Sequence, residues 1–257
     1  MVYSNIDNSV LSKIDELRLL AATKNPHIIS LVEIKPKHGR IPDINTFQIP
    51  GYNLYTNNLE AEGVRGVCIY VCSSLKSSVV DIPHNKFQDQ LTISVPTMTS
   101  SVLFQCVYRS GTPKKAISLD DDMFNLFSET SKLTQHSKHI IVGDFNHDMI
   151  QWDPEPMLKE NSQPDSPEQK FVDCIRDSFL VQHISQPTRY RVNNRPTKDD
   201  LIFSKDDLIF STHVDNIVYN PSIGLSDHLE IQSLSNKKIK IFNVLSGLFY
   251  MLLVYLY

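Results

Sequence analysis

Short apolar runs, each closed by polar or charged residues, follow one another along this sequence. Strand-like runs occur at His27–Val32, Gly66–Cys72, Val102–Tyr108 and His139–Val142. Neighbouring runs often lack a helical pattern between them, which favours mixed or antiparallel sheets over a wholly parallel sheet. The sequence therefore predicts an α/β fold in which two packed sheets are flanked by helices.

The beginning of the chain has a β-α-β pattern. Val2–Asn5 is short and extended, apolar residues within Val10–Ala21 recur at helical spacing, and the run His27–Val32 follows. Further helices are predicted at Asp120–Ser131 and Glu168–Asp177, and further strands at Gln90–Val95, Leu180–Ile184, Asp200–Ser204, Leu208–Asp215 and Leu229–Leu234.

The charge of the chain gives no general support to nucleic-acid binding. The formal net charge is −4, and lysines 237, 238 and 240 lie near the C-terminus, so the rest of the chain is more acidic still. Recognition of phosphate must then come from local basic clusters or from a bound cation. Solvated loops are the structural alternative for such clusters. The predicted substrate contacts lie in two of them, at Arg109, Ser110, Arg189 and Arg191.

The C-terminal segment differs from the rest of the sequence. Ile241–Tyr257 contains no charged residue and follows a lysine-rich stretch, which places it at the lower edge of the roughly 17–25 residues that span a bilayer. We expect residues 1–235 to form the domain and residues 236–257 to form a marginal membrane anchor or a read-through extension. Met1–Asn8 is short and polar, unlike a signal peptide. The four cysteines lack the paired spacing of a zinc site, so reduced thiols in an intracellular protein are expected.

Polar residues suited to a cation or a phosphate stand where the predicted strands end. A carboxylate placed just beyond a buried strand is held rigidly and still reaches solvent, as Mg²⁺ requires of its ligands. Each residue also has a structural alternative: Asn5 could cap a helix, Glu33 could be a solvated loop acid, and Asp144 with Asn146 could form an Asx turn. Their recurrence at successive strand ends favours one catalytic site.

Six segments carry a resemblance to a known family. They are SLVEIKPK with Glu33, GVRGVCIYV, CVYRSG, IVGDFNHD, RPTKDDLIFS and LSDHLEI. In order and approximate spacing they resemble the endonuclease/exonuclease/phosphatase superfamily over about residues 1–235. YSN before the KIDEL helix, YRS and GDFNH look like the apurinic-type endonuclease domain of non-LTR retrotransposons.

The resemblance implies a four-layer α/β sandwich that hydrolyses a phosphodiester with Mg²⁺ or Mn²⁺. It implies that Glu33 binds the metal, with Asn5 and Asp227 close by. It also implies that Asp144 activates the water, that Asn146 positions the water and the phosphate, and that Tyr108 donates a hydrogen bond to a phosphate oxygen. His228 is implied to stabilise the pentacovalent phosphorus, and Asp200 to orient His228.

One position in this assignment has an alternative. The related segment usually carries an apolar residue where this chain has Asp199. Asp200 is followed by Leu201, Ile202 and Phe203, which matches the family pattern better, so Asp200 is the predicted partner of His228 and Asp199 is the alternative.

The expected function is that of a nuclear, monomeric DNA endonuclease derived from a retrotransposon, which nicks DNA and leaves a 3′-hydroxyl. Two alternatives stay open. One is abasic-site repair or another phosphoesterase activity of the same fold, and the other is a catalytically silent remnant.

Overall fold

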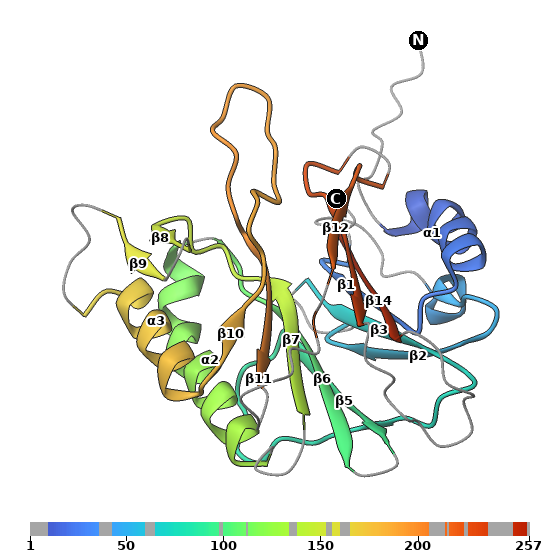
Figure 1. The fold of residues 1–257 in the computed structure, drawn as a ribbon, viewed down its shortest axis with the longest axis horizontal. Helices are drawn as coiled ribbons and strands as arrows, with labels where there is room; N and C mark the ends of the chain where they lie inside the picture. The colour runs from blue at the N-terminus through green and yellow to red at the C-terminus, as the bar shows by residue number, and fades with distance from the viewer. Residues whose placement is uncertain are drawn as a thin grey trace.

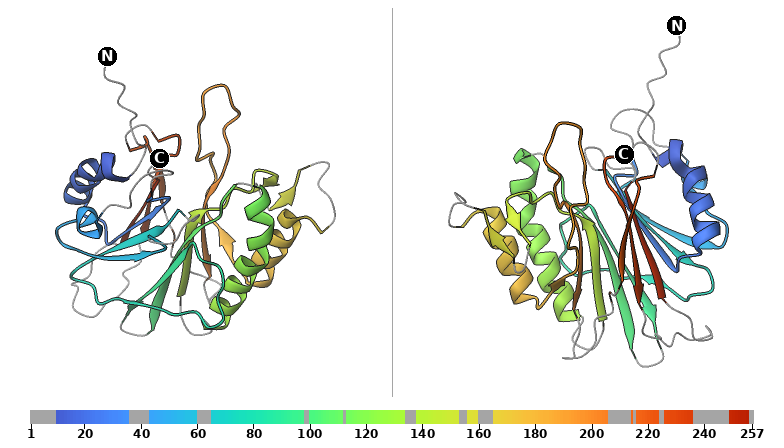
Figure 2. Two further views of the ribbon diagram at one scale, coloured as in Figure 1. Left: turned by 180° about the vertical axis from the view of Figure 1, so that it is seen from behind. Right: turned by 45° about the horizontal axis from the view of Figure 1, so that its top comes forward.

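The computed structural model describes residues 10–35, 43–59, 65–97, 100–111, 113–133, 138–152, 156–159, 165–205, 214, 216–223, 226–235 and 249–255. Over these ranges, two six-stranded sheets pack face to face and helices cover their outer faces (Figures 1 and 2). The predicted four-layer α/β sandwich is confirmed.

The first sheet has the strand order β12-β13-β14-β1-β3-β2. Its strands are β1 (Ile28–Val32), β2 (Tyr52–Asn57), β3 (Val67–Cys72), β12 (Ile217–Asn220), β13 (Glu230–Ser235) and β14 (Phe249–Tyr255). Strand β1 is antiparallel to β3 and parallel to β14. All five residues of β1 are buried, because both faces of this sheet are covered, and this explains its nearly continuous apolar sequence.

The second sheet has the strand order β10-β11-β7-β6-β5-β4. Its strands are β4 (Ser78–Val79), β5 (Gln90–Pro96), β6 (Ser101–Tyr108), β7 (Lys138–Asp144), β10 (Val181–Gln182) and β11 (Asp200–Lys205), and a separate hairpin contains β8 (Ile150–Gln151) and β9 (Met157–Leu158). Strands β6 and β7 are parallel and approach closely at Gly143. A Cβ atom at Gly143 would lie 1.8 Å from the carbonyl oxygen of Val107, so this position requires glycine.

Helices lie on the outside of both sheets (Figures 1 and 2). Helix α1 (Val10–Lys24) and the 3₁₀ helix η1 (Ile44–Phe47) lie beside the first sheet, whereas α2 (Pro113–Leu133) and α3 (Pro167–Asp177) cover the second. The Ser166 hydroxyl caps α3 by accepting a hydrogen bond from the Gln169 amide, and Pro167 occupies the first turn. Phe171 and Ile175 face the core because they lie four residues apart on one side of the helix.

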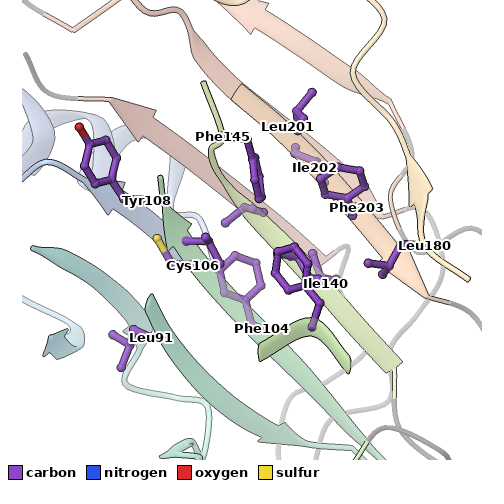
Figure 3. Packing of buried hydrophobic residues seen from close by; sticks show 14 of the residues in the cluster. Leu91, Phe104, Cys106, Tyr108, Ile140, Phe145, Leu180, Leu201, Ile202 and Phe203 are labelled. Atoms are coloured by element: carbon purple, nitrogen blue, oxygen red, sulfur yellow. The ribbon is translucent and has the colours of Figure 1, made fainter. Parts of the chain in front are cut away.

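An apolar cluster joins the two sheets and includes side chains of α2 and α3. Figure 3 shows part of it, around the strands of the second sheet. Its aromatic part surrounds Phe145, whose ring centroid lies 5.5 Å from that of Phe171 and 5.4 Å from that of Phe203. Tyr108 lies at one end of the cluster, with its hydroxyl directed away from the labelled apolar side chains (Figure 3). Since Phe145 directly follows Asp144, this packing fixes the chain just beyond β7.

The C-terminal residues 249–255 belong to the first sheet. Residues 236–257 were expected outside the domain, but residues 249–255 form β14, which pairs with β1 on one side and β13 on the other. The first sheet therefore extends past residue 235. No helix in the described ranges combines the length and apolarity needed to cross a membrane. The predicted strand Val2–Asn5 and most of the predicted strand Leu208–Asp215 lie outside the described residues.

Candidate active site

Three neighbouring strands bring polar side chains together at one edge of the second sheet. Tyr108 ends β6 and is paired in register with Asp144, which ends the parallel strand β7. Asp200 begins the antiparallel strand β11 and is also paired with Asp144. The three residues thus lie side by side across the sheet, as the positions of the predicted strand ends indicated.

Asp200 and His228 form a buried pair. Both side chains are fully buried, and Nδ1 of His228 lies 2.8 Å from Oδ2 and 3.0 Å from Oδ1 of Asp200. Burial by itself would lower the pKa of His228, but the charge and hydrogen bond of Asp200 and the charge of Asp144 raise it to about 9. The Thr188 hydroxyl accepts a hydrogen bond from the Asp200 amide at 3.1 Å. His228 is therefore held as a cation with a fixed ring orientation.

Asp199 has a different partner. Its Oδ2 lies 3.1 Å from Nη1 of Arg189, and its carbonyl accepts a hydrogen bond from the Phe145 amide at 2.9 Å. Asp200, and not Asp199, contacts His228 in this structure.

Asp144 has one engaged and one available carboxylate oxygen. Asn146 donates to Oδ1 from its side-chain amide at 2.6 Å and from its backbone amide at 3.2 Å. Oδ2 is buried and accepts no hydrogen bond from the described part of the chain. Burial and the charge of Asp200 raise the pKa of Asp144 well above its usual range, although the charge of His228 opposes this. Oδ2 is thus positioned to accept a proton or to bind a cation.

Glu33 lies across from Asp144, at the end of β1. It is buried and has a positive φ of 54°, an uncommon backbone conformation that is typical of functional sites. Its Oε1 accepts a hydrogen bond from the Tyr108 hydroxyl and lies 3.2 Å from Nη1 of Arg65. Burial and the charges of Glu33 and Asp144 raise the pKa of Tyr108, so the phenol stays protonated and donates.

Asp227 is held by two arginines. Its Oδ2 lies 3.0 Å from Nε of Arg189 and 2.7 Å from Nε of Arg191, and its Oδ1 lies 3.7 Å from Nε2 of His228. Arg189 is buried and also reaches Oδ1 of Asn146 at 3.4 Å. In this position Arg189 organises the acidic side chains of the site, whereas Arg191 is half-exposed and can still contact a substrate.

Arg109, a predicted substrate contact, makes its contacts within the protein. Its guanidinium is buried, lies 2.7 Å from Oδ1 of Asp120 and donates to the carbonyl oxygens of Phe145 and Asn146. Arg109 therefore supports the loop that carries Asn146 from behind. Ser110 is partly exposed next to it, so a contact from Ser110 to substrate remains a prediction.

A cavity of about 200 Å³ opens beside these residues. It is lined by Gly111, Asn146 and Asp199, and by three arginines of the segment that precedes β11, which are Arg189, Arg191 and Arg195. This segment projects beyond the ends of the sheets (Figure 1). Asp148 also lines the cavity, and the three arginines outnumber the two acids, so the lining can supply charge-assisted hydrogen bonds to a phosphate group.

The donor set suits a hard divalent cation. Ligand atoms of Asp144, Asp200 and His228 lie within 4.8 Å of one another. Since Asp200 and His228 engage each other and Oδ2 of Asp144 is positioned to accept a proton, the Glu33 carboxylate is the better ligand for a hard cation. Glu33 is the metal ligand that the sequence predicted. Asp227, predicted close to the metal, pairs with two arginines through Oδ2 and its role stays a prediction, and Asn5 lies outside the described residues.

Sequence reasoning assigned no role to several residues that shape this site. Arg65 lies within the quoted segment GVRGVCIYV, and Thr188 directly precedes Arg189. Asp120 belongs to a run of three acids in α2, and nothing in that run marks it as the partner of Arg109.

The comparison with known proteins agrees with this geometry. The model of the endonuclease/exonuclease/phosphatase family matches residues 2–228. No curated protein matches the sequence significantly.

Solved structures share the fold at low sequence identity. The endonuclease domain of TRAS1, a telomere-specific non-LTR retrotransposon, is 15% identical, with a TM-score of 0.61, over 88% of this chain and 92% of that one. The 3′-5′ exonuclease NExo from Neisseria meningitidis is 17% identical, with a TM-score of 0.61, over 87% and 94%. D. rerio TDP2, complexed with a single-strand DNA product, is 11% identical, with a TM-score of 0.56, over 88% and 91%.

Proposed function

The chain belongs to the endonuclease/exonuclease/phosphatase family, and we propose that it is a metal-dependent DNA endonuclease that nicks one strand and leaves a 3′-hydroxyl. The observation that carries this proposal is the cationic His228, held by Asp200 directly beside Asp144. A proton acceptor and a positively charged donor on the two sides of a phosphate are what phosphodiester hydrolysis requires.

Each residue has one task in the proposed reaction. Asp144 accepts a proton from water at Oδ2, where its raised pKa makes it a stronger base than an ordinary carboxylate. The water oxygen forms a bond to phosphorus, the bond between phosphorus and the 3′-oxygen breaks, and the departing 3′-oxygen takes a proton from solvent water to become the 3′-hydroxyl. His228 donates from Nε2 to a phosphate oxygen, because Asp200 holds Nδ1. Asn146 fixes the Asp144 carboxylate, and Tyr108 fixes Glu33.

A divalent cation, Mg²⁺ or Mn²⁺, would be held by Glu33. When bound, it would offset the negative charge that develops on the phosphate oxygens. DNA is the proposed substrate because NExo is described as bound to a product DNA hairpin and TDP2 as complexed with a single-strand DNA product. A nuclear location and a monomeric state are part of this proposal, and the described site residues all belong to one chain.

Nicking of supercoiled plasmid tests the proposal. We expect nicked circles with Mg²⁺, no product with EDTA, and direct extension of the nicks by a DNA polymerase, since a 3′-hydroxyl needs no repair. Asp144→Asn should abolish nicking, whereas Asp165→Asn is the matched control: Asp165 is exposed, and its positive φ of 64° suits asparagine. Absence of nicking by folded wild-type protein with either metal would overturn the endonuclease proposal.

Processing of DNA 3′ ends is a second candidate function. It is favoured by the similarity to NExo, described both as a 3′-5′ exonuclease and as a 3′ phosphatase bound to a product DNA hairpin. Labelled hairpins with a recessed 3′-hydroxyl or a 3′-phosphate distinguish the two functions. Shortening of the first or dephosphorylation of the second, with intact plasmid, would support end processing instead.

A further inference from the structure

Arg65 lies next to Glu33 on a backbone that is fixed by its surroundings. The carbonyl oxygen of Arg65 accepts a hydrogen bond from the Lys35 amide at 3.0 Å, which continues the β1–β3 pairing beyond the strand ends. The amide of the next residue, Gly66, donates to Oδ1 of Asp89 at 3.3 Å. The guanidinium of Arg65 therefore starts from a defined position opposite the end of β1.

The Arg65 guanidinium contacts the same oxygen that Tyr108 engages. Nη1 of Arg65 lies 3.2 Å from Oε1 of Glu33, and Arg65 is close enough to Tyr108 that its charge opposes the rise in the pKa of the phenol. The Glu33 side chain is 2% exposed and that of Arg65 is 19% exposed. Solvent thus reaches Arg65, and the carboxylate is buried behind it.

A buried carboxylate is costly without a compensating positive charge. In the protein without metal, Arg65 supplies this charge at Glu33. A divalent cation that binds Glu33 must share the carboxylate with Arg65 or displace it, because two cations at one oxygen repel each other. The long arginine side chain can withdraw toward solvent without movement of its backbone.

We propose that Arg65 is the resident counter-ion of Glu33 and competes with the divalent cation for this carboxylate, so that Arg65 sets the metal affinity of the site. The inference rests on the proposed function, because it takes Glu33 as part of the metal site. Arg65 acts here as a positioning residue through Glu33. If Arg65 served only to hold Glu33 in place, its removal would weaken metal binding, so the two roles predict opposite signs.

Titration of Mn²⁺ into the full chain without DNA separates these roles, with calorimetry or the electron paramagnetic resonance of free Mn²⁺ as the readout. Arg65→Gln should bind Mn²⁺ on the order of tenfold more tightly than wild type, as expected when a competing charge-assisted contact is lost. Arg65→Lys keeps the charge and should stay close to wild type. Glu33→Gln should bind more weakly.

Arg176→Gln is the matched control for a general change of charge. Arg176 is half-exposed on the outer helix α3, and its replacement should leave the Mn²⁺ affinity unchanged. Near-ultraviolet circular dichroism establishes that each variant is folded.

Two results would overturn the inference, and they are distinguishable. Unchanged or weaker Mn²⁺ binding by folded Arg65→Gln, with wild type that binds Mn²⁺ and nicks DNA, contradicts the role of Arg65 alone. Failure of wild type both to bind Mn²⁺ and to nick DNA contradicts the proposed function on which the inference rests.

Discussion

Nδ1 of His228 lies 2.8 Å from Oδ2 of Asp200, and both side chains are fully buried. The two residues lie 28 positions apart in the sequence. They meet because Asp200 begins β11 at the end of the sheet where the chain that leads into β13 passes. A buried imidazolium and carboxylate of this kind depend on each other for charge and orientation.

The first prediction concerns this coupling. His228→Ala should slow single-turnover nicking by the equivalent of roughly 2.7–4 kcal/mol, the scale of a lost oxyanion donor. Asp200→Asn should also be slow, and the double variant should be little slower than His228→Ala, because both changes remove one function. Asp199→Asn should have a smaller effect, since Asp199 pairs with Arg189. Additive losses for Asp200 and His228 would show that the two residues act separately.

The second prediction is a dependence of stability on pH. The pKa of His228 is raised from 6.5 to about 9 in the folded protein, so the folded state binds the proton more tightly than the unfolded state. The resulting stability is fully present below about pH 6.5 and is lost as pH rises through about 9, at up to about 1.4 kcal/mol per pH unit. Urea unfolding across this range should show the loss in wild type and a flatter profile in His228→Gln. Parallel profiles would contradict the assigned pKa.

The third prediction concerns Gly143. A methyl group at this position meets the Val107 carbonyl oxygen at 1.8 Å, and backbone atoms cannot yield as a flexible side chain can. Gly143→Ala should therefore separate β6 from β7, destabilise the fold by about 3 kcal/mol or more and displace Asp144. Thermal unfolding and nicking measure both effects. Ser94→Ala on the neighbouring strand β5, at a partly exposed position, is the control and should change little.

The strand ends of the site could be predicted from the sequence because each is a local pattern. An apolar run such as Lys138–Asp144 determines both a strand and the polar residue that ends it. Strand β2 (Tyr52–Asn57) was not predicted, because it lies at the sheet edge and its residues are half-buried or exposed with no clear apolar run.

Contacts between distant segments could not be predicted in the same way. Arg109 belongs to a basic stretch that is typical of a solvated loop or phosphate contact, but its pairing with Asp120 depends on how α2 packs. Likewise, Arg65 contacts Glu33 because the pairing of β1 with β3 brings the chain just before β3 next to the end of β1. Periodicity identifies strands and helices, whereas the partner of a buried charge is set by tertiary packing.

The last prediction concerns the C-terminal strand. Strand β14 is paired through five residues with β1 and through five with β13, and these two strands lead to Glu33 and follow His228. Removal of residues 236–257 should expose both strand edges, with a loss of roughly 0.5–1.5 kcal/mol for each hydrogen bond that is not replaced. We expect a lower midpoint of urea unfolding and slower nicking than in the full chain.

If the segment were instead a membrane anchor, the truncated chain would keep its stability and activity, and only the full chain would partition into lipid vesicles and resist a carbonate wash. Equal stability of the two chains would therefore contradict the role of β14 in the sheet, whereas a destabilised truncated chain with no vesicle binding by the full chain would support it.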